Sequence, residues 1–313
     1  MKDKFGRTIT YLRLSVTDLC NLRCRYCMPA EGVCKKDHGE MLTEEELIAV
    51  AEAGASLGIK KVRITGGEPL VKKNILSICR GVSAVDGIEE LCLTTNGILL
   101  PELAVPLREA GVKRVNISLD SLDRDTYARL TRRDRLDDAL RGLESALSAG
   151  FDRVKVNCVL LAGENEREIS ALAELTRKYP VDVRFIEWMP MTHDPVGQHL
   201  SCEAVLKALP ALTKEDEGAV AEHYRLPGAL GKIGLIRPVS RHFCGKCDRI
   251  RVTADGKVKP CLHSREELSL KGLRKEEMAQ VLRQAILEKP PCHGPLSPES
   301  PSPAGRMMNQ IGG

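Results

Sequence analysis

Aromatic residues are scarce in this chain of 313 residues, at 3% of the sequence with a single tryptophan. Proteins that bind single-stranded RNA rely on aromatic side chains for base stacking, so this shortage argues against a nucleic-acid-binding module. The formal net charge is only +4, and the basic residues are scattered. This mild basicity suits an anionic small ligand without requiring one, and it gives no electrostatic case for nucleic acid.

Long hydrophobic runs are also missing. The sequence contains no run of about eighteen apolar residues, so we expect no membrane-spanning helix. The first residues, MKDKFGRTITYLRL, lack the continuous apolar stretch of a signal peptide, and we therefore expect a cytoplasmic protein. Cysteine, in contrast, occurs twelve times. In a cytoplasmic chain this number indicates metal or redox chemistry rather than a disulfide framework.

A strand-then-helix rhythm fills the first two thirds of the chain. Apolar, β-branched segments predict strands at Tyr11–Thr17, Lys61–Thr65, Glu90–Thr95, Arg114–Leu119, Arg153–Leu160 and Val181–Trp188. Helix-like segments between them are Thr43–Leu57, Leu99–Ala110, Arg124–Ala149 and Asn165–Tyr179. Thr43 and Glu46 have the spacing of a capping box, and Gly58, Gly111 and Gly150 stand where helices should end. Six βα units are fewer than the eight of a closed barrel. We therefore predict an α/β fold: a partial, curved (β/α)₆ TIM-like barrel over residues 1–190, with its site at the carboxyl ends of the strands.

The rhythm changes after Met189, and we expect residues 191–289 to form a separate C-terminal region. Residues 190–243 are glycine-rich and predicted to be irregular, whereas Ala254-Asp255-Gly256 predicts a hairpin turn. Residues 265–288 predict one or two helices. Six prolines among the fourteen positions 290–303 predict an extended linker rather than packed structure, so residues 290–313 form a linker and a Gly-Gly tail.

The first cysteine motif, Cys20-x₃-Cys24-x₂-Cys27, directly follows the first predicted strand. Three thiolates leave one iron of a [4Fe–4S] cluster without a protein ligand, and such an open iron can bind a small chelating substrate. A structural zinc site is the alternative. Zinc usually requires a fourth ligand nearby, and His38 is the only local candidate.

The second motif, Cys244-x₂-Cys247-x₁₃-Cys261, is again a set of three thiols. Half of a zinc ribbon has this form, and His242 or His263 could complete it. Arg249 and Arg251 favour another interpretation, because alternate positions of a strand place both guanidinium groups on one face. Two arginines beside a metal centre suit a polyphosphate, which each can bind through two oxygens.

The first motif, with an aromatic residue before its last cysteine, resembles the signature of the radical S-adenosylmethionine superfamily. Gly66-Gly67-Glu68-Pro69, after the second predicted strand, is similar to the GGEP motif of that superfamily. The resemblance implies that S-adenosylmethionine chelates the open iron and is reduced to a 5′-deoxyadenosyl radical. It also implies cofactor contacts at Tyr26, Gly67, Ser118 and Met189. Without the resemblance, Ser118 and Met189 would be interpreted as a strand-end hydrogen bond and as core packing.

Both cysteine motifs, the Arg-x-Arg pair and the Gly-Gly end together resemble the molybdenum-cofactor biosynthesis protein A family of GTP 3′,8-cyclases, from Arg13 to Gly313. This resemblance implies two [4Fe–4S] clusters with GTP between them, and a catalytic role for Gly312 and Gly313. The implied GTP contacts are Arg13, Arg63, Thr94, Lys155, Arg249 and Arg251. Arg13 and Arg63 support this independently, because an arginine within an apolar strand is costly unless it faces a ligand.

The implied activity is that of a radical lyase. The 3′ hydrogen of the GTP ribose is abstracted, the carbon radical attacks C8 of guanine, and reduction and protonation give (8S)-3′,8-cyclo-7,8-dihydroguanosine 5′-triphosphate, a molybdopterin precursor. The implied partners are an unidentified reductant, a downstream cyclic pyranopterin monophosphate synthase and, as one oligomeric state, a second copy of the chain.

Two alternatives are open: a radical peptide-modifying maturase with an auxiliary cluster, and a non-catalytic metal-binding module for RNA. The cysteines without a motif role are Cys34, Cys79, Cys92, Cys158, Cys202 and Cys292.

Overall fold

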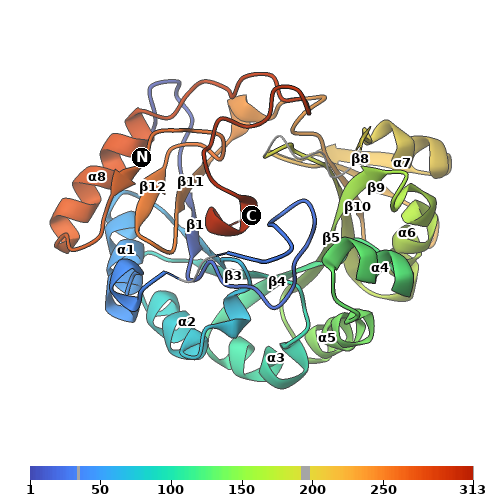
Figure 1. The fold of residues 1–313 in the computed structure, drawn as a ribbon, viewed down its shortest axis with the longest axis horizontal. Helices are drawn as coiled ribbons and strands as arrows, with labels where there is room; N and C mark the ends of the chain where they lie inside the picture. The colour runs from blue at the N-terminus through green and yellow to red at the C-terminus, as the bar shows by residue number, and fades with distance from the viewer. Residues whose placement is uncertain (34–35, 192–197, 313) are drawn as a thin grey trace.

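The computed structural model describes residues 1–33, 36–191 and 198–312. Six neighbouring parallel strands confirm the predicted core of the fold, and they follow one another in chain order. They are β1 (Tyr11–Ser15), β2 (Lys61–Thr65), β3 (Glu90–Thr95), β4 (Val112–Ser118), β5 (Arg153–Ala162) and β6 (Val181–Glu187). Figure 1 shows the curved sheet with its helices on the outside and the C-terminus in the middle.

The outer helices connect these strands. They are α1 (Glu44–Ser56), α2 (Ile75–Ser83), α3 (Leu100–Glu109), α4 (Arg124–Thr131), α5 (Leu136–Ser148) and α6 (Ile169–Lys178). The predicted capping box is present at the start of α1, where Thr43 and Glu46 each accept a hydrogen bond from the backbone of the other. Gly58, Gly111 and Gly150 have φ angles of +87°, +92° and +75°, which only glycine adopts without strain.

Two helix predictions were wrong. Helix α2 was not predicted, although its buried residues Ile75, Ile78, Cys79 and Val82 have helical spacing. The segment Arg124–Ala149 is two helices rather than one, because the chain turns at Arg132, whose φ of +55° is left-handed. Loss of the regular helical backbone at Arg132 ends α4 there.

The region after β6 extends the barrel at both edges. Regular elements within residues 198–236 correct the expectation that residues 190–243 are irregular, whereas a strand at Arg249 and Arg251 was predicted. Strand β10 (Ile233–Ile236) pairs parallel with β6, and β11 (Arg249–Val252) pairs parallel with β1. The other elements are β7 (Gln198–His199), α7 (Glu203–Ala208), β8 (Thr213–Glu217), β9 (Glu222–Arg225), β12 (Lys257–Lys259), β13 (Leu268–Ser269) and α8 (Lys275–Leu287). The β11–β12 hairpin confirms the predicted turn at residues 254–256. The sheet runs from β13 to β8 as an open path and does not close.

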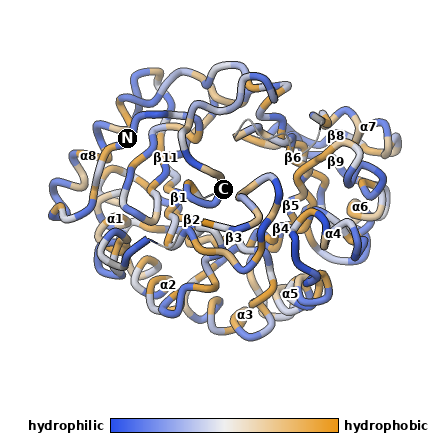
Figure 2. Tube along the Cα trace, in the orientation of Figure 1, coloured by the Kyte–Doolittle hydropathy of each residue, from blue (hydrophilic) through white to orange (hydrophobic). Residues whose placement is uncertain are grey.

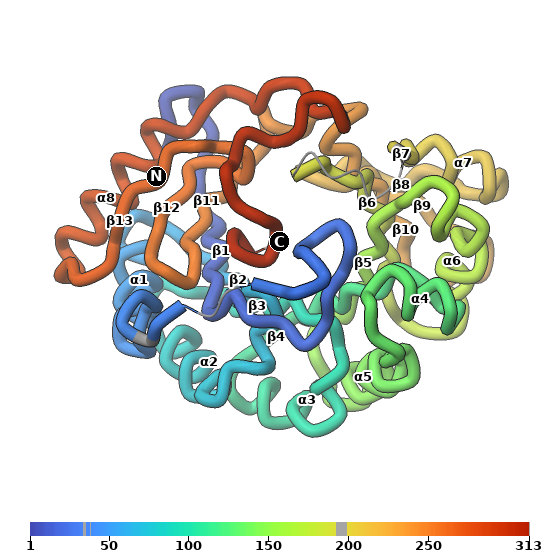
Figure 3. Tube along the Cα trace, in the orientation of Figure 1, coloured from blue at the N-terminus to red at the C-terminus, as the bar shows by residue number. Residues whose placement is uncertain are grey.

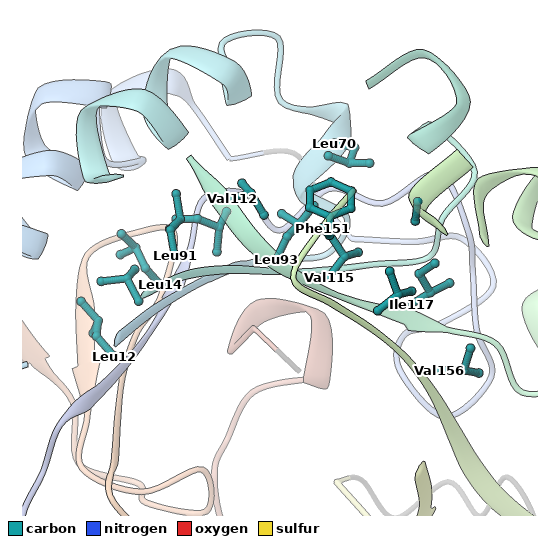
Figure 4. Close-up of a cluster of buried hydrophobic side chains, with 14 of the residues drawn as sticks. Leu12, Leu14, Leu70, Leu91, Leu93, Val112, Val115, Ile117, Phe151 and Val156 are labelled. Atoms are coloured by element: carbon teal, nitrogen blue, oxygen red, sulfur yellow. The ribbon is translucent and has the colours of Figure 1, made fainter. Parts of the chain in front are cut away.

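Alternation along the parallel strands separates a core from a lumen. On β1, Leu12 and Leu14 are fully buried, whereas Tyr11 and Arg13 line a cavity on the opposite face. Figure 2 shows hydrophobic and hydrophilic residues following each other along the strands. The core lies between the sheet and the helices, and Figure 4 shows part of it, including Leu91, Leu93 and Val115. The polar face of the sheet is therefore turned inward, unlike the packed interior of a closed TIM barrel.

The C-terminal segment packs against the barrel. Residues 290–303 form no regular element, but Leu296 and Ser302 are buried, and the Ser302 N–H donates to the Pro190 carbonyl oxygen at 2.8 Å. The prediction of an unpacked linker was therefore wrong. After it, the chain enters the lumen and forms a short 3₁₀ helix at Met308–Gln310, visible as the red end of the tube in Figure 3. Among the described residues, no helix is long and apolar enough to cross a membrane.

Candidate active site

One cavity of about 690 Å³ occupies the barrel lumen, which places it near the middle of the range of about 300–1,000 Å³ for ligand sites. It brings together all six cysteines of the two motifs and every residue predicted to contact S-adenosylmethionine or GTP. These residues are Cys20, Cys24, Cys27, Cys244, Cys247, Cys261, Tyr26, Gly67, Ser118, Met189, Arg13, Arg63, Thr94, Lys155, Arg249 and Arg251.

The first cysteine loop follows β1 at the carboxyl end of the barrel. The end of α4 supports it: the Arg23 N–H donates to the Thr131 carbonyl, and the Arg25 N–H donates to that of Leu130. The Arg132 guanidinium donates to the carbonyl oxygens of Arg23 and Met28, each at 3.0 Å. The left-handed backbone at Arg132 ends α4 beside the cysteine loop. The last carbonyl groups of α4 and the Arg132 guanidinium are therefore able to hydrogen-bond that loop. No pattern in the sequence predicted a role for Arg132.

Gly66 and Gly67 pass close to the backbone just before Cys20. A Cβ on Gly67 would lie 2.4 Å from the Leu19 carbonyl oxygen, so no other residue fits there without movement of the backbone. The Gly67 N–H donates to the Thr17 carbonyl at 2.7 Å. Glu68 is buried and accepts hydrogen bonds from Thr95 and from the backbone of Leu70 and Asn96. Burial raises its pKa to about 7 against these hydrogen bonds. The GGEP segment therefore connects the first three strand ends.

The donor set of the first site fits a cluster better than a single ion. Burial raises the pKa of Cys20 to about 11 and that of Cys27 to about 12, so a metal is needed to hold these groups as thiolates. Two thiolates bound to one zinc ion cannot lie more than about 4.6 Å apart. The sulfur atoms of Cys20, Cys24 and Cys27 do not all lie within 4.8 Å of one another. Their wider spacing suits a larger centre, and the side chain of His38 lies outside what the structure describes.

Tyr26 is fixed beside this site by a carboxylate. Its hydroxyl donates to Asp120 Oδ2 at 2.6 Å, and the Val159 N–H donates to Oδ1 of the same group at 2.8 Å. Burial raises the pKa of Asp120 to about 6, which the two hydrogen bonds oppose. Asp120, just after β4, thereby connects Tyr26 of the first loop to β5.

The second cysteine set lies at the opposite end of the lumen. Cys244 and Cys247 come just before β11, and Cys261 comes just after the antiparallel strand β12. Because β11 is parallel to β1, these positions are at the amino end of β1, whereas Cys20 follows its carboxyl end. The length of β1, about 13 Å at roughly 3.3 Å a residue, separates the two ends. The sequence did not predict this placement.

Two rows of side chains cross the wall between the cysteine sets. Arg249, Tyr11 and Lys61 are neighbours in one row of the sheet register, and Arg251, Arg13 and Arg63 are neighbours in the next. Nine basic residues line the cavity against four acidic ones. The basic residues are Arg13, Lys61, Arg63, Arg114, Lys155, Arg184, Arg249, Arg251 and Lys289, and the acidic ones are Glu68, Asp120, Glu187 and Asp248. This excess of positive charge favours a polyanionic ligand.

The lumen disfavours the charged form of several of its arginines. Burial, together with neighbouring guanidinium groups, lowers the pKa of Arg251 and of Arg184 to about 9. Burial opposes ionisation of Tyr11, but Arg63, Arg13 and Arg249 outweigh it and lower the pKa of its hydroxyl to about 8. The Nε atoms of Arg184 and Arg249 are buried without a hydrogen-bond partner. Phosphate oxygens would satisfy these donors and stabilise the charged guanidinium groups.

Arg184 on β6 was missed by the sequence analysis. It alternates with the buried residues Val183 and Phe185, so the signal was the one used for Arg13 and Arg63: a cation inside an apolar strand. Cys79, Cys92, Cys158 and Cys202 are fully buried, as expected for cysteines that pack as small hydrophobic residues. Cys292 is exposed, and Cys34 lies outside the described residues.

The C-terminal residues hydrogen-bond both the arginines of the cavity wall and the loop before Cys20. The Gly312 carbonyl oxygen accepts hydrogen bonds from Arg13 and Arg251, and the Asn309 side-chain amide donates to the Asp18 carbonyl at 3.0 Å. A Cβ on Gly312 would lie 3.1 Å from Thr65 Cγ2, so the space around the tail is narrow at this residue. Gly313 lies outside the described residues.

Comparisons with known proteins agree with this geometry. Residues 14–176 match the model of the radical SAM superfamily, and residues 181–295 match that of the Molybdenum Cofactor Synthesis C family. The chain is 48% identical over 321 residues to the GTP 3′,8-cyclase of Alkaliphilus oremlandii, and 43% identical over 329 residues to that of Moorella thermoacetica; each alignment covers 100% of both chains. The chain belongs to the GTP 3′,8-cyclase family.

Solved structures show the same fold at low sequence identity. SuiB from Streptococcus suis, in a crystal structure with bound S-adenosylmethionine, is 14% identical and has a TM-score of 0.62 over 87% of this chain and 64% of that one. The fold is therefore that of radical SAM enzymes, as predicted. The full-length cyclase relatives favour the cyclase family over the maturase alternative. Because these relatives are enzymes, they give no support to the alternative of a non-catalytic RNA-binding module.

Proposed function

We propose that this member of the GTP 3′,8-cyclase family converts GTP into (8S)-3′,8-cyclo-7,8-dihydroguanosine 5′-triphosphate for molybdenum-cofactor biosynthesis. One observation carries the proposal: an arginine-lined cavity joins two sets of three cysteines at opposite ends of one barrel. The names of the full-length relatives support the same reaction.

The cysteine sets have separate tasks in this proposal. Cys20, Cys24 and Cys27 hold one [4Fe–4S] cluster, and Cys244, Cys247 and Cys261 hold a second. The first cluster, with S-adenosylmethionine bound, supplies the electron that yields the 5′-deoxyadenosyl radical. The residues around it that hold S-adenosylmethionine are Tyr26, Gly67, Ser118 and Met189.

The wall between the two sites orients GTP. Arg249, Arg251 and Arg184 bind the triphosphate, with further contacts from Arg13, Arg63, Thr94 and Lys155. The guanine lies toward the second cysteine set, and the ribose 3′ hydrogen faces the first. The lumen and the tail keep water and other hydrogen donors away from the substrate radical while the bond from C3′ to C8 forms. An external donor supplies the electron for the final reduction, and solvent supplies the proton. The proposal includes a cyclic pyranopterin monophosphate synthase as consumer of the product and a homodimer as the working oligomer.

Isotope transfer tests the reaction directly. Anaerobically reconstituted protein would be incubated with S-adenosylmethionine, a reductant and GTP carrying deuterium at C3′, and both products would be separated and analysed by mass. We expect deuterium in 5′-deoxyadenosine and a cyclised nucleotide that has lost the label, whereas ATP should give neither. Label-free 5′-deoxyadenosine beside unchanged GTP would overturn the proposal.

A further inference from the structure

A group of histidine and cysteine side chains stands beside the second cysteine set. One ligand atom each of His242, Cys244 and His293 lies within 4.8 Å of the other two. Within residues 1–33, 36–191 and 198–312, no other three Cys, His, Asp or Glu side chains come together so closely. The three come from two segments far apart in the sequence, the loop before β11 and the C-terminal segment after α8.

This spacing suits a single metal ion rather than a cluster. Zinc binds histidine nitrogen at about 2.0–2.1 Å and cysteine sulfur at about 2.3 Å, so its ligand atoms lie within about 4.6 Å of one another. Cys244, Cys247 and Cys261 do not meet even the 4.8 Å limit as a set. Cys244 therefore belongs to two ligand sets of different size.

The hydrogen bonding of His293 gives a second, independent observation. Its Nδ1 lies 2.7 Å from the Gly294 carbonyl oxygen, which can only accept, so Nδ1 carries a proton. The ring also hydrogen-bonds Cys244, so the imidazole and the thiol already face each other. Histidines that bind metals usually donate their other ring N–H to a carbonyl or carboxylate in this way. The rings of His242 and His293 stack with centroids 4.2 Å apart and an interplanar angle of 27°, which holds the two imidazoles side by side.

We propose that His242, Cys244 and His293 bind one divalent transition-metal ion when the second cluster is absent, with Zn²⁺ as the best match to two imidazoles and one thiolate. Binding forms two metal–nitrogen bonds and one metal–sulfur bond and releases the Cys244 thiol proton to solvent. A water completes the four-coordinate site. The zinc site itself stands without the proposed function. Its consequence rests on that function: because Cys244 is shared, a bound zinc ion excludes the second cluster.

The test uses the full-length chain with Cys20, Cys24 and Cys27 replaced by alanine, purified without iron under anaerobic conditions. Zn²⁺ would be titrated against a chromophoric chelator. We expect one equivalent of tight binding, weakened on the order of 100-fold or more in His242→Ala and in His293→Ala, since losing a ligand costs at least as much as losing its hydrogen-bond partner. Cys247→Ser should keep the affinity, and so should His199→Asn, which changes an exposed histidine on β7.

The opposite pattern would overturn the proposal. If Cys247→Ser or Cys261→Ser abolishes zinc binding while both histidine variants keep it, the metal is held by the three thiols. X-ray absorption of zinc bound to the chain with both histidines intact gives a second measurement that does not depend on the folding of a histidine variant. Two nitrogen ligands and one sulfur are expected, and three sulfurs contradict the proposal.

Cluster assembly separates this proposal from the proposed function. In the same chain, zinc added before iron and sulfide should block the second cluster, and His242→Ala should restore its assembly in the presence of zinc. Assembly that is equally complete with and without zinc contradicts the consequence. A chain that binds zinc as expected but never assembles a second cluster would contradict the proposed function instead.

Discussion

Arg251 on β11 donates from Nη1 to the Gly312 carbonyl oxygen at 2.9 Å, across sixty-one positions of sequence. Arg13 on β1 donates to the same oxygen at 3.1 Å. The last described residue of the chain thus offers a partial negative charge to two guanidinium groups that are proposed to contact GTP. Since both arginines neighbour each other in the sheet register, a shift of the tail changes their surroundings together.

Replacing Cys24 by alanine should abolish formation of 5′-deoxyadenosine. The variant leaves two thiols at the first site, and no spare cysteine stands in the described part of that loop. The measurement is chromatographic quantitation of 5′-deoxyadenosine after reduction with dithionite. Cys79→Ala is the control, because Cys79 is a cysteine without a motif role that lies buried on α2 away from the cavity, so this variant should cleave normally. Normal cleavage by Cys24→Ala would mean that the first cluster is held elsewhere.

Arg249→Ala and Arg184→Ala should each weaken GTP binding. Loss of one charge-assisted phosphate contact costs about 1.5–3 kcal/mol, or roughly 10–150-fold in affinity. Equilibrium binding measured by calorimetry would detect this, while slow uncoupled cleavage of S-adenosylmethionine should persist. Arg141→Ala removes an exposed cation on α5 and should change nothing. Unaltered affinity in both lumen variants would place the triphosphate elsewhere.

Sequence periodicity located the barrel strands well, because each alternates buried apolar residues with residues that face the lumen. Strands β2 and β3 have the predicted bounds Lys61–Thr65 and Glu90–Thr95. Strand β8, TKEDE, could not be found this way, since all of its residues are exposed and none is apolar. Strand β10 is a short buried run, IGLI, which periodicity alone cannot distinguish from a helix or loop.

The residue types of the site were also predictable, but its arrangement was not. A cysteine motif identifies the residues that can bind a metal. A cationic residue within an apolar strand predicts a side chain that faces a bound substrate. That β11 pairs parallel with β1, and so carries Cys244 and Cys247 to the far end of the lumen, depends on a long-range register that no local pattern encodes. Arg132 illustrates the same limit, because its left-handed backbone is stabilised by the carbonyl oxygens of a distant loop.

Arg306 should be a positioning residue for the tail. Its guanidinium bridges Glu267 at 2.6 and 2.7 Å and Asp255 at 3.0 and 3.1 Å, with 16% of the side chain exposed. Burial raises the pKa of Asp255, but Lys36, Thr253 and Arg306 outweigh it and lower the pKa to about 2, so the pair stays ionised at neutral pH.

We expect Arg306→Gln to release the tail from the lumen and to lower product formation at least about tenfold, because one neutral amide cannot replace a group that bridges two carboxylates. Both clusters should remain. Limited proteolysis followed by mass analysis should show faster cleavage after residue 300, a change that loss of a catalytic contact would not cause. Arg265→Gln is the control, since Arg265 also contacts the C-terminal segment, at the Pro303 carbonyl, but is exposed. Equal protease resistance in the two variants would contradict the role of Arg306.

Gly312→Ala tests whether the narrow passage of the tail matters for the reaction. Gly312 has a φ of +69°, and an added Cβ would lie 3.1 Å from Thr65 Cγ2 and 3.3 Å from Ser15 Cβ. The methyl group must therefore displace the tail or the ends of β1 and β2. Gly305→Ala is a closely matched control: its φ is +68°, but nothing lies within 4 Å of the added atom. Both variants carry the same backbone strain, and only one carries the steric conflict.

We expect Gly312→Ala to lose most product formation while 5′-deoxyadenosine still forms, now uncoupled from GTP. Both clusters should assemble normally, and the affinity for GTP should change little, because Arg249 and Arg184 are not displaced. Gly305→Ala should differ from the unchanged chain only by a small loss of stability. The ratio of cyclised nucleotide to 5′-deoxyadenosine, measured for the two variants side by side, decides the matter. Equal ratios would mean that the tail fills the lumen without directing the radical, and that its contacts with Arg13 and Arg251 serve stability alone.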